Sequence, residues 1–384
     1  MSTASYNYPE DFGAVGNGTT DDTAAIQQAL NAMATTRELH FKAKRYRVNG
    51  TLTVSHPGKI TGEGRNATYI LAGSASANVF NFAQGFLEME EFKIEAAPGV
   101  TRTGGSYINC PVSSNITLRN FEMDGAHTGI SSNATVMTIA GAQIRNTRPG
   151  GISIAINDGF DVSIRDVIMD APGNQQPFAG IAVFKTGDCT IEDCNIIHQG
   201  QDLYISPRAG QGVFALYAVN TFFDTANAGV VIAPQNGGVV GRCMFNGCWM
   251  ASHSTDGIRI DSDDPSWVDG VQFNNCHVFQ NANNGLTIPG GPAPSARIRN
   301  IDIRNSIFAE NAGSGIWVNN SMNGLRVVDN VLMAWGGFNQ NGNPMWFAAG
   351  GGGANRCLIT DNHSTSGLLI GALGAQSRNA DNVS

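Results

Sequence analysis

Short apolar stretches recur along most of the chain at a nearly constant spacing. A small residue followed by Ile, Val or Leu repeats at intervals of 22 to 30 residues, about 27 on average. Between these pairs, apolar and polar residues alternate and then give way to Asn and Gly, which is typical of short strands joined by tight turns. The anchoring pairs are Gly129-Ile130, Gly151-Ile152, Gly180-Ile181, Asp202-Leu203, Gly229-Val230, Gly257-Ile258, Gly285-Leu286 and Gly315-Ile316.

A repeat with three short strands and three turns predicts an all-β fold, a right-handed parallel β-helix. Leucine-rich repeats would need Leu at fixed positions and usually a helix in each repeat, and the chain has neither. At about 4.8 Å per coil, we expect a solenoid of about 10–12 coils. Residues 46–349 would form this β-helix, and the glycine run 350–353 would connect it to a C-terminal segment, 350–384.

Residues 1–45 follow a different pattern, which predicts an N-terminal cap. A Gly-rich loop leads to an N-cap candidate at Thr20 or Asp21, and an amphipathic stretch follows. A helix there would cover the apolar interior and the strand edges of the first coil. Its two adjoining apolar sides carry Ala25, Ala29 and Ala32, and Ile26, Leu30 and Met33.

Composition and charge narrow the fold and the partners. The chain contains 47 Gly and 38 Asn, which break helices, and only 14% charged residues, so a helical bundle is excluded. The net charge of −8 provides no basic footprint for nucleic acid. No apolar run approaches the length of about 18 residues that spans a membrane, and no Sec-type signal pattern is present, so we expect a soluble protein that binds neither nucleic acid nor membrane.

The seven cysteines and seven histidines show no metal-binding spacing, and we predict no disulfide framework, metal or cofactor. Alignment on the anchoring pairs places Cys248, Cys276 and Ser306 at one equivalent position. It places Asn275 above Asn305 one residue earlier. Like residues stacked along a parallel sheet form ladders, so we expect buried structural thiols and Asn turns.

The stretch Asp-Phe-Gly-Ala-Val-Gly-Asn-Gly-Thr-Thr-Asp-Asp-Thr-Ala-Ala-Ile, residues 11–26, closely resembles the opening of the pectate-lyase-like superfamily. That group includes bacteriophage tailspikes, mannuronan epimerases and endorhamnosidase-type depolymerases. The strand 46–48 and the turn 62–64 look similar as well. The resemblance implies a fold rather than a chemistry, and Asp11, Asp21 and Asp22 are expected to cap the helix and brace its loop.

Residues at one offset in each repeat would form columns along the outside of the coils. Two places after the anchor, the column contains Ser153, Ala182, Tyr204, Val231, Arg259, Thr287 and Trp317. Aromatic and charged side chains therefore concentrate between the coils of Gly180 and Gly315, a combination that suits a polysaccharide. We expect one face to carry catalytic Lys185, Tyr204, Asp261 and Asp263, with Arg208, His253, Arg259, Asp264, Trp267 and Trp317 binding the substrate.

Asp261 and Asp263 are the candidate acid and base. Residues two apart on an extended segment point the same way, with roots about 6.5 to 7 Å apart, near the lower end of the separation in inverting glycosidases. The alternative is a turn or a cation site, because Asp, Pro and Ser are typical turn residues. Both interpretations remain open from the sequence.

Two motifs resemble those of known enzymes and depart from them. The segment 254–258, Ser-Thr-Asp-Gly-Ile, is similar to the Asn-Thr-Asp-Gly motif of polygalacturonases, but Asn283-Asn284 stands where their double Asp is expected. Lyase or epimerase chemistry needs a base, a cation for the enolate and often a Tyr, which Lys185, Tyr204 and Arg208 could supply. Alginate epimerases carry Asp-Pro-His where this chain has Ser206-Pro207-Arg208.

The sequence thus favours a tailspike-like protein of a virion tail that binds a bacterial surface polysaccharide. Whether it also depolymerises this polysaccharide stays open from the sequence. The alternatives are a stand-alone polysaccharide lyase, hydrolase or epimerase, which would be secreted, and a non-catalytic adhesin or baseplate component. Outward Phe184, Trp267 and Trp317 and the apolar segment 345–349 suggest surface that an oligomer would bury. With the resemblance to tailspikes, we expect a homotrimer.

Overall fold

A computed structural model gives the fold, in which the chain divides into unit 1 (Met1–Ile181) and unit 2 (Ala182–Ser384). Parallel strands form a β-solenoid of about 11 turns, which confirms the predicted fold class. No helix among the described residues is long and apolar enough to cross a membrane. The structure describes residues 7–112, 115–173, 176–289, 297–318, 322–333, 343–347, 356–364 and 378–382.

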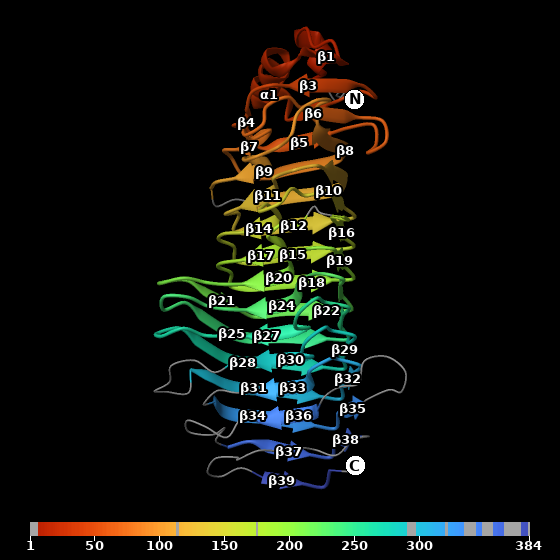
Figure 1. The fold of residues 1–384 in the computed structure, drawn as a ribbon. Helices are drawn as coiled ribbons and strands as arrows, with labels where there is room; N and C mark the ends of the chain where they lie inside the picture. Colours follow the sequence, from red (N-terminus) through yellow and green to blue (C-terminus); the bar gives the residue numbers. More distant parts are fainter. Residues whose placement is uncertain are drawn as a thin grey trace, which may run out of the picture. The chain divides into compact units, whose positions relative to one another are not determined.

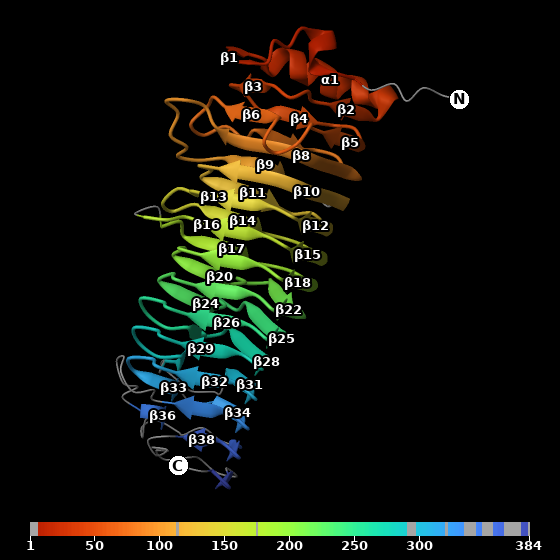
Figure 2. The same cartoon turned by 90° about the vertical axis from the view of Figure 1, so that its right-hand side faces the viewer.

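Unit 1 begins with the predicted cap. Helix α1 (Thr23–Thr36) starts after Asp22 and buries Ile26, Ala29, Leu30 and Met33. This helix contacts strands β2 (Glu38–His40) and β4 (Leu52–Val54), which come from the first coils (Figure 2). The predicted amphipathic helix is confirmed, and its buried side shields the apolar interior of those coils.

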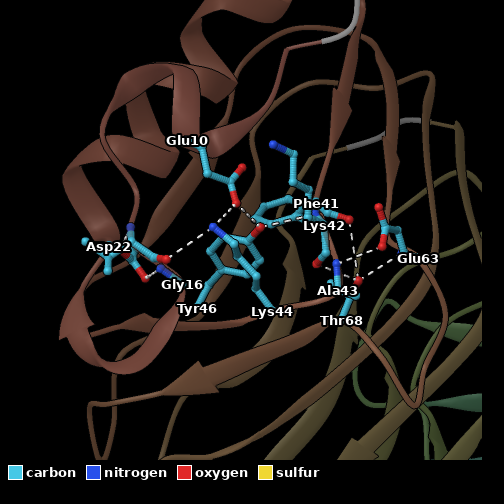
Figure 3. Close-up of polar contacts among 11 residues, drawn as sticks. Glu10, Gly16, Asp22, Phe41, Lys42, Ala43, Lys44, Tyr46, Glu63 and Thr68 are labelled. Carbon is cyan, nitrogen blue, oxygen red and sulfur yellow. Dashed lines mark hydrogen bonds and ion pairs between the residues drawn. The ribbon is translucent and has the colours of Figure 1, made fainter.

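Polar side chains brace the loop around the cap (Figure 3). The Asp22 carboxylate accepts hydrogen bonds from the backbone N–H groups of Val15 and Gly16, at 2.7 and 3.1 Å. The Tyr46 hydroxyl donates to Glu10 at 2.8 Å, and the same carboxylate oxygen lies 2.9 Å from Lys44 Nζ. The sequence predicted that Asp11, Asp21 and Asp22 brace this loop, and the prediction is confirmed at Asp22.

The remaining strands of unit 1 pair in parallel, coil upon coil (Figure 1). Its elements besides α1 are a 3-10 helix (Pro9–Phe12), β1 (Asn17–Asp21), β2 (Glu38–His40), β3 (Arg45–Val48), β4 (Leu52–Val54), β5 (Gly58–Thr61), β6 (Tyr69–Ala72), β7 (Phe80–Phe82), β8 (Leu87–Ala96), β9 (Ser106–Cys110), β10 (Asn115–Asp124), β11 (Thr128–Ser132), β12 (Val136–Ala140), β13 (Gln143–Arg145), β14 (Ile152–Ile156), β15 (Asp161–Arg165) and β16 (Ile168–Asp170), and β17 (Ala179–Val183) crosses the division.

One predicted anchor in unit 1 is wrong by two residues. Ile130 pairs with Ile154, so Gly129 lies opposite Ser153 and not opposite Gly151. Ser153 is buried and hydrogen-bonds Thr147, so it does not belong to the outward column. The sequence contains two overlapping pairs, Gly151-Ile152 and Ser153-Ile154, and the pattern alone does not choose between them.

Unit 2 repeats the same coil. Its strands are β18 (Asp188–Glu192), β19 (Asn195–Ile197), β20 (Gln201–Ile205), β21 (Gly212–Phe214), β22 (Leu216–Val219), β23 (Phe222–Asp224), β24 (Ala228–Ile232), β25 (Val239–Asn246), β26 (Trp249–Ala251), β27 (Ile258–Ile260), β28 (Trp267–Asn274), β29 (His277–Phe279), β30 (Leu286–Ile288), β31 (Ile298–Arg304), β32 (Ile307–Ala309), β33 (Ser314–Val318), β34 (Met322–Val328), β35 (Val331–Met333), β36 (Asn343–Phe347), β37 (Leu358–Thr360), β38 (His363–Ser364) and β39 (Arg378–Ala380).

Two sets of strands in unit 2 matter for function. We call β20, β24, β27, β30, β33 and β36 the B strands, because each pairs with the next in one sheet. We call the remaining strands of unit 2 the A strands, among which β21, β25, β28 and β31 pair in sequence. The inward residues of both sets are mainly Val, Ile, Leu and Phe, with some Met, Cys and Ala, and they form the core.

The predicted ladder of small residues is confirmed at a corner between A strands. Asn275 and Asn305 have φ of 54° and 49°, the left-handed conformation that turns the chain and that Asn tolerates. The next residue of each coil stacks inside: Cys276 N–H donates to Ser306 Oγ, and Cys248 lies at the same register. All seven cysteines are buried thiols, as expected.

Strands after residue 350 continue the pairing of unit 2. β37 pairs with β34, and β39 pairs with β37, so described parts of the segment 350–384 belong to the same sheet as the preceding coils. The glycine run 350–353 and residues 348–349 lie outside the described residues. Of the apolar segment 345–349 that we expected at the surface, Met345 is fully buried, since it pairs inward opposite Ile316.

Candidate functional site

The B strands of unit 2 carry the predicted outward column. Tyr204 lies opposite Val231, Val231 opposite Arg259, Arg259 opposite Thr287, and Thr287 opposite Trp317. This order of residues is the one predicted by aligning the repeats of the sequence on their anchoring pairs. The two smaller residues, Val231 and Thr287, are buried. They alternate along the column with the larger and more exposed Tyr204, Arg259 and Trp317.

Arg259 is the centre of the polar part of this column. Its Nη2 lies 3.3 Å from Asp261 Oδ2, and its Nη1 lies 3.8 Å from Asp256 Oδ2. The side chains of Arg259 and Asp261 are 41% and 40% exposed, so a ligand can reach both. We call Tyr204, Arg259, Asp261 and Trp317 the B face.

Asp256 is a further carboxylate beside Arg259, and sequence reasoning did not select it as a site residue. Its carboxylate is almost completely buried, and Oδ1 accepts hydrogen bonds from Asn283 Nδ2, the Asn284 backbone N–H and Thr287 Oγ1. These donors fix the carboxylate that faces Arg259. The signal was the Ser-Thr-Asp-Gly segment, and Asn283-Asn284 supplies donors where polygalacturonases have carboxylates.

Tyr204 is held by its neighbours at one end of the column. Its hydroxyl accepts a hydrogen bond from Gln235 Nε2 at 3.3 Å, and its ring meets Phe184 edge to face with ring centres 6.4 Å apart. Lys185, next to Phe184, is half-buried. Arg208 follows β20 in an exposed loop, where its backbone N–H donates to Gln211.

Asp263 and Asp264 lie in the turn that follows β27, and Trp267 lies on the next A strand. Both Asp263 oxygens accept the Asn236 N–H, at 3.0 and 2.9 Å, and Ser266 Oγ also donates to it, so this carboxylate braces a turn. Asp264 pairs with Arg297. Trp267 begins β28, an A strand, opposite Val239. The expectation that Trp267 shares one face with Arg259 is therefore wrong, because the chain turns between Asp261 and Trp267 and the two residues lie on different strands.

His253 lies inside unit 2 and not on its surface. Its Nδ1 donates to Asn281 Oδ1 at 2.6 Å, since the Asn281 amide itself donates to Asn311. Its Nε2 lies 2.9 Å from Asp202 Oδ2, and both side chains are fully buried. Gly229 makes room for the imidazole, because a Cβ there would approach His253 Cε1 to 2.7 Å. His253 thus cannot touch a surface polysaccharide.

Electrostatics in this buried pair favour a single shared proton. Burial raises the pKa of the Asp202 carboxyl well above its usual range. Burial also lowers the pKa of His253 to about 4. The pair therefore carries no net charge, which agrees with the cost of burying an unpaired ion. Among the described residues, no group of three His, Cys, Asp or Glu is arranged to hold a metal ion.

Known proteins share parts of this sequence. The family model described as the right handed beta helix region matches residues 100–342, more than half of the chain. A capsule K30/K69-specific depolymerase of Klebsiella phage K64-1 is 40% identical over 77 residues. Those residues are 20% of this chain and 10% of that relative, so the chain matches only a tenth of the relative's length.

Solved structures share the fold at low identity. Tailspike protein 3 of bacteriophage CBA120 has a TM-score of 0.58 and 11% identity, covering 98% of this chain and 61% of that one. The catalytic unit of an α-1,3-glucanase from Streptomyces thermodiastaticus has a TM-score of 0.58 and 12% identity, covering 100% and 71%. At such identities the likeness concerns the backbone.

Proposed function

We propose, since this chain belongs to the right-handed β-helix family, that it is a tailspike-like protein that binds a bacterial surface polysaccharide on the B face of unit 2. The observation that carries the proposal is the register of the B strands, which places Tyr204, Arg259 and Trp317 in one outward column. The similarity to a phage capsule depolymerase over 77 residues supports the same class of ligand.

The B face offers the two kinds of contact that sugars need. Tyr204 and Trp317 present aromatic rings on which the apolar faces of sugar rings pack. Arg259 donates hydrogen bonds and Asp261 accepts them, and such charge-assisted bonds to hydroxyls are stronger than neutral ones. Asp256 keeps the guanidinium of Arg259 in place, which lowers the ordering cost of binding.

Depolymerisation at the same face is a second candidate function, favoured by the exposed Asp261 carboxylate beside Arg259. In hydrolysis, Asp261 would act as acid or base, with a second group from Tyr204 or Lys185. In elimination from a uronate, Arg259 would stabilise the enolate charge and Tyr204 or Lys185 would move the proton. The turn-bracing contacts of Asp263 leave it less suited to the role of partner.

Assembly and location belong to the same proposal. We place the chain in a virion tail as a homotrimer, with secretion and a stand-alone enzyme as the alternative. Light scattering tests the homotrimer directly. A mass near three times the 40.5 kDa of one chain supports the trimer, and a mass near 40.5 kDa contradicts it.

Binding to a panel of purified capsular polysaccharides tests the main claim. We expect the wild-type chain to bind at least one of them, and Arg259→Gln to weaken that binding about tenfold or more, since a charge-assisted hydrogen bond contributes roughly 1.5–3 kcal/mol. Arg326→Gln, an exposed arginine on an A strand, is the matched control. Equal loss in both variants would contradict a site at the B face.

The same samples distinguish binding from cleavage. Release of reducing ends indicates depolymerisation, and the ultraviolet absorbance of an unsaturated uronate would identify it as elimination. Asp261→Asn should abolish that release while binding persists. Binding without either signal, in the wild-type chain, would leave the chain as a binding module.

A further inference from the structure

The A strands of unit 2 enclose a hollow of about 750 Å³ that is separate from the B face. Phe214 on β21, Gly241 on β25 and Trp267 on β28 line it, together with Arg242, Asp269 and Arg299. Phe214 lies opposite Gly241, Gly241 opposite Asp269, and Asp269 opposite Arg299. We call this the Phe214 hollow.

The Phe214 side chain packs over two glycines and is partly exposed. A Cβ at Gly212 would approach Phe214 Cε2 to 2.3 Å, and a Cβ at Gly241 would approach Cδ1 to 3.3 Å. The two glycines therefore make room for the ring. The residue is nevertheless 42% exposed, so part of the side chain is available to a ligand.

Trp267 and its arginines form the opposite wall. β21 and β28 are separated by β25, so the two walls are about 10 Å apart across the floor at Gly241. The guanidinium carbons of Arg299 and Arg297 lie 4.8 and 5.4 Å from the Trp267 ring centre. These cations cover Trp267, which makes Phe214 the open aromatic platform and the far wall a source of N–H donors.

The charge of the hollow is positive although the chain is acidic. Asp269 is compensated, because Arg299 Nε donates to Oδ2 at 2.9 Å and Asn300 Nδ2 donates to Oδ1 at 2.7 Å. Arg242 is exposed, and among the residues that the structure describes it forms no ion pair. An anionic group beside the Phe214 ring would therefore meet an available guanidinium, which binds carboxylates in a bidentate manner.

We infer that the Phe214 hollow binds a sugar ring that carries a carboxylate, a uronate of an acidic polysaccharide. The ring packs on Phe214, and its carboxylate pairs with Arg242. The inference extends the proposed polysaccharide binding to a second site, on different strands, that takes no part in cleavage. The aromatic platform favours a sugar ring as the ligand of the hollow, and the uncompensated positive charge favours a carboxylate on that ring.

Calorimetric titration with hexagalacturonate, and with maltohexaose as the neutral probe, tests this inference. The wild-type chain should bind hexagalacturonate at least fivefold more tightly than maltohexaose. Phe214→Ala and Arg242→Gln should each weaken that binding at least fivefold, and Arg242→Lys should weaken it less. Phe222→Ala and Arg326→Gln, which change an exposed Phe and an exposed Arg outside the hollow, should have no effect.

Three results would overturn the inference. Hexagalacturonate binding that is absent, or unchanged in Phe214→Ala and Arg242→Gln, would leave Phe214 with the structural role of covering glycines, visible as a lower melting temperature. A change of molecular mass in Phe214→Ala would assign the hollow to a second copy of the chain. Loss of hexagalacturonate binding in Arg259→Gln instead of Arg242→Gln would assign the ligand to the B face, whose own test uses capsular polysaccharides.

Discussion

The same strand position carries different side chains in the two units. In unit 1, the outward residues at this position are Asn81, Asn109, Ser131 and Ala155, and Asn109 donates a hydrogen bond to Asn81 at 2.8 Å. In unit 2, the equivalent column presents Tyr204, Arg259 and Trp317. The backbone is the same parallel coil, so the chemistry resides in the outward side chains and not in the fold.

Carboxylates also differ between the units in what they contact. In the cap of unit 1, Asp22 is almost fully buried and accepts two backbone N–H groups. On the B face of unit 2, Asp261 is half-exposed beside Arg259. Loss of the first should therefore affect stability, and loss of the second should affect ligands. The predictions below test this division.

The largest expected effect is that of Asp22→Ala in unit 1. Removing the carboxylate leaves two backbone N–H groups without their acceptor, which should cost about 3 kcal/mol of local stability. Hydrogen exchange at the Val15 and Gly16 amides measures it, and polysaccharide binding should be unchanged. Asp11→Ala, which removes one exposed contact with Tyr8, is the control. Similar rates of hydrogen exchange in Asp22→Ala and Asp11→Ala would contradict the stabilising role of Asp22.

A smaller effect, of about tenfold, is expected for polysaccharide binding when Trp317 is replaced by Ala. Loss of one aromatic contact removes roughly 0.5–1.5 kcal/mol beyond its buried area. Asn109→Ala, at the equivalent position of unit 1, should leave binding unchanged. Affinity for the same capsular polysaccharide decides the question, and a loss in Asn109→Ala would show that the outward column of unit 1 also binds sugar.

The buried pair of Asp202 and His253 in unit 2 should respond to pH, whereas a buried hydroxyl pair in unit 1 should not. Unit 1 has the neutral pair Thr147 and Ser153, and unit 2 has Asp202 and His253. The folded pair keeps one proton, because the pKa of Asp202 is raised and that of His253 is lowered to about 4. Unfolded, the two groups together hold one proton between about pH 3.9 and 6.5 and none above.

Stability of unit 2 should therefore decrease as the pH rises above about 6.5, by up to about 1.4 kcal/mol per pH unit while Asp202 keeps its proton. Between about pH 4 and 6.5 the two opposite shifts cancel. Asp202→Asn retains a donor for His253 Nε2 without a titrating proton, so its unfolding free energy relative to wild type should improve above pH 6.5. A difference that is independent of pH would contradict the shared proton.

The smallest expected effect concerns Asp263→Asn. Its carboxylate braces the turn through Asn236 and Ser266, so the change should cost about 1 kcal/mol or less and leave binding intact. Asp261→Asn should leave stability nearly unchanged and abolish depolymerisation, while binding persists. Equal loss of depolymerisation in both variants would restore the two residues as an acid and base pair.

The sequence predicted the column of unit 2 correctly because the repeat length keeps each Gly-Ile pair in register. It did not predict where the coil turns, and so it grouped Trp267 with Arg259, although they stand on different strands. His253 was misplaced for a related reason. Its spacing from Asn281 and Asn311 follows the repeat, which indicated an inward ladder, but its charged neighbours in sequence suggested the surface.

The most direct test of the central claim is a crystal structure of the chain with an oligosaccharide from a capsular polysaccharide that it binds. The proposal predicts sugar rings along the B strands of unit 2, packed on Tyr204 or Trp317 and hydrogen-bonded to Arg259 and Asp261. Sugar on the column of Asn109 and Ser131 in unit 1, with the B face of unit 2 unoccupied in the same crystal, would contradict it.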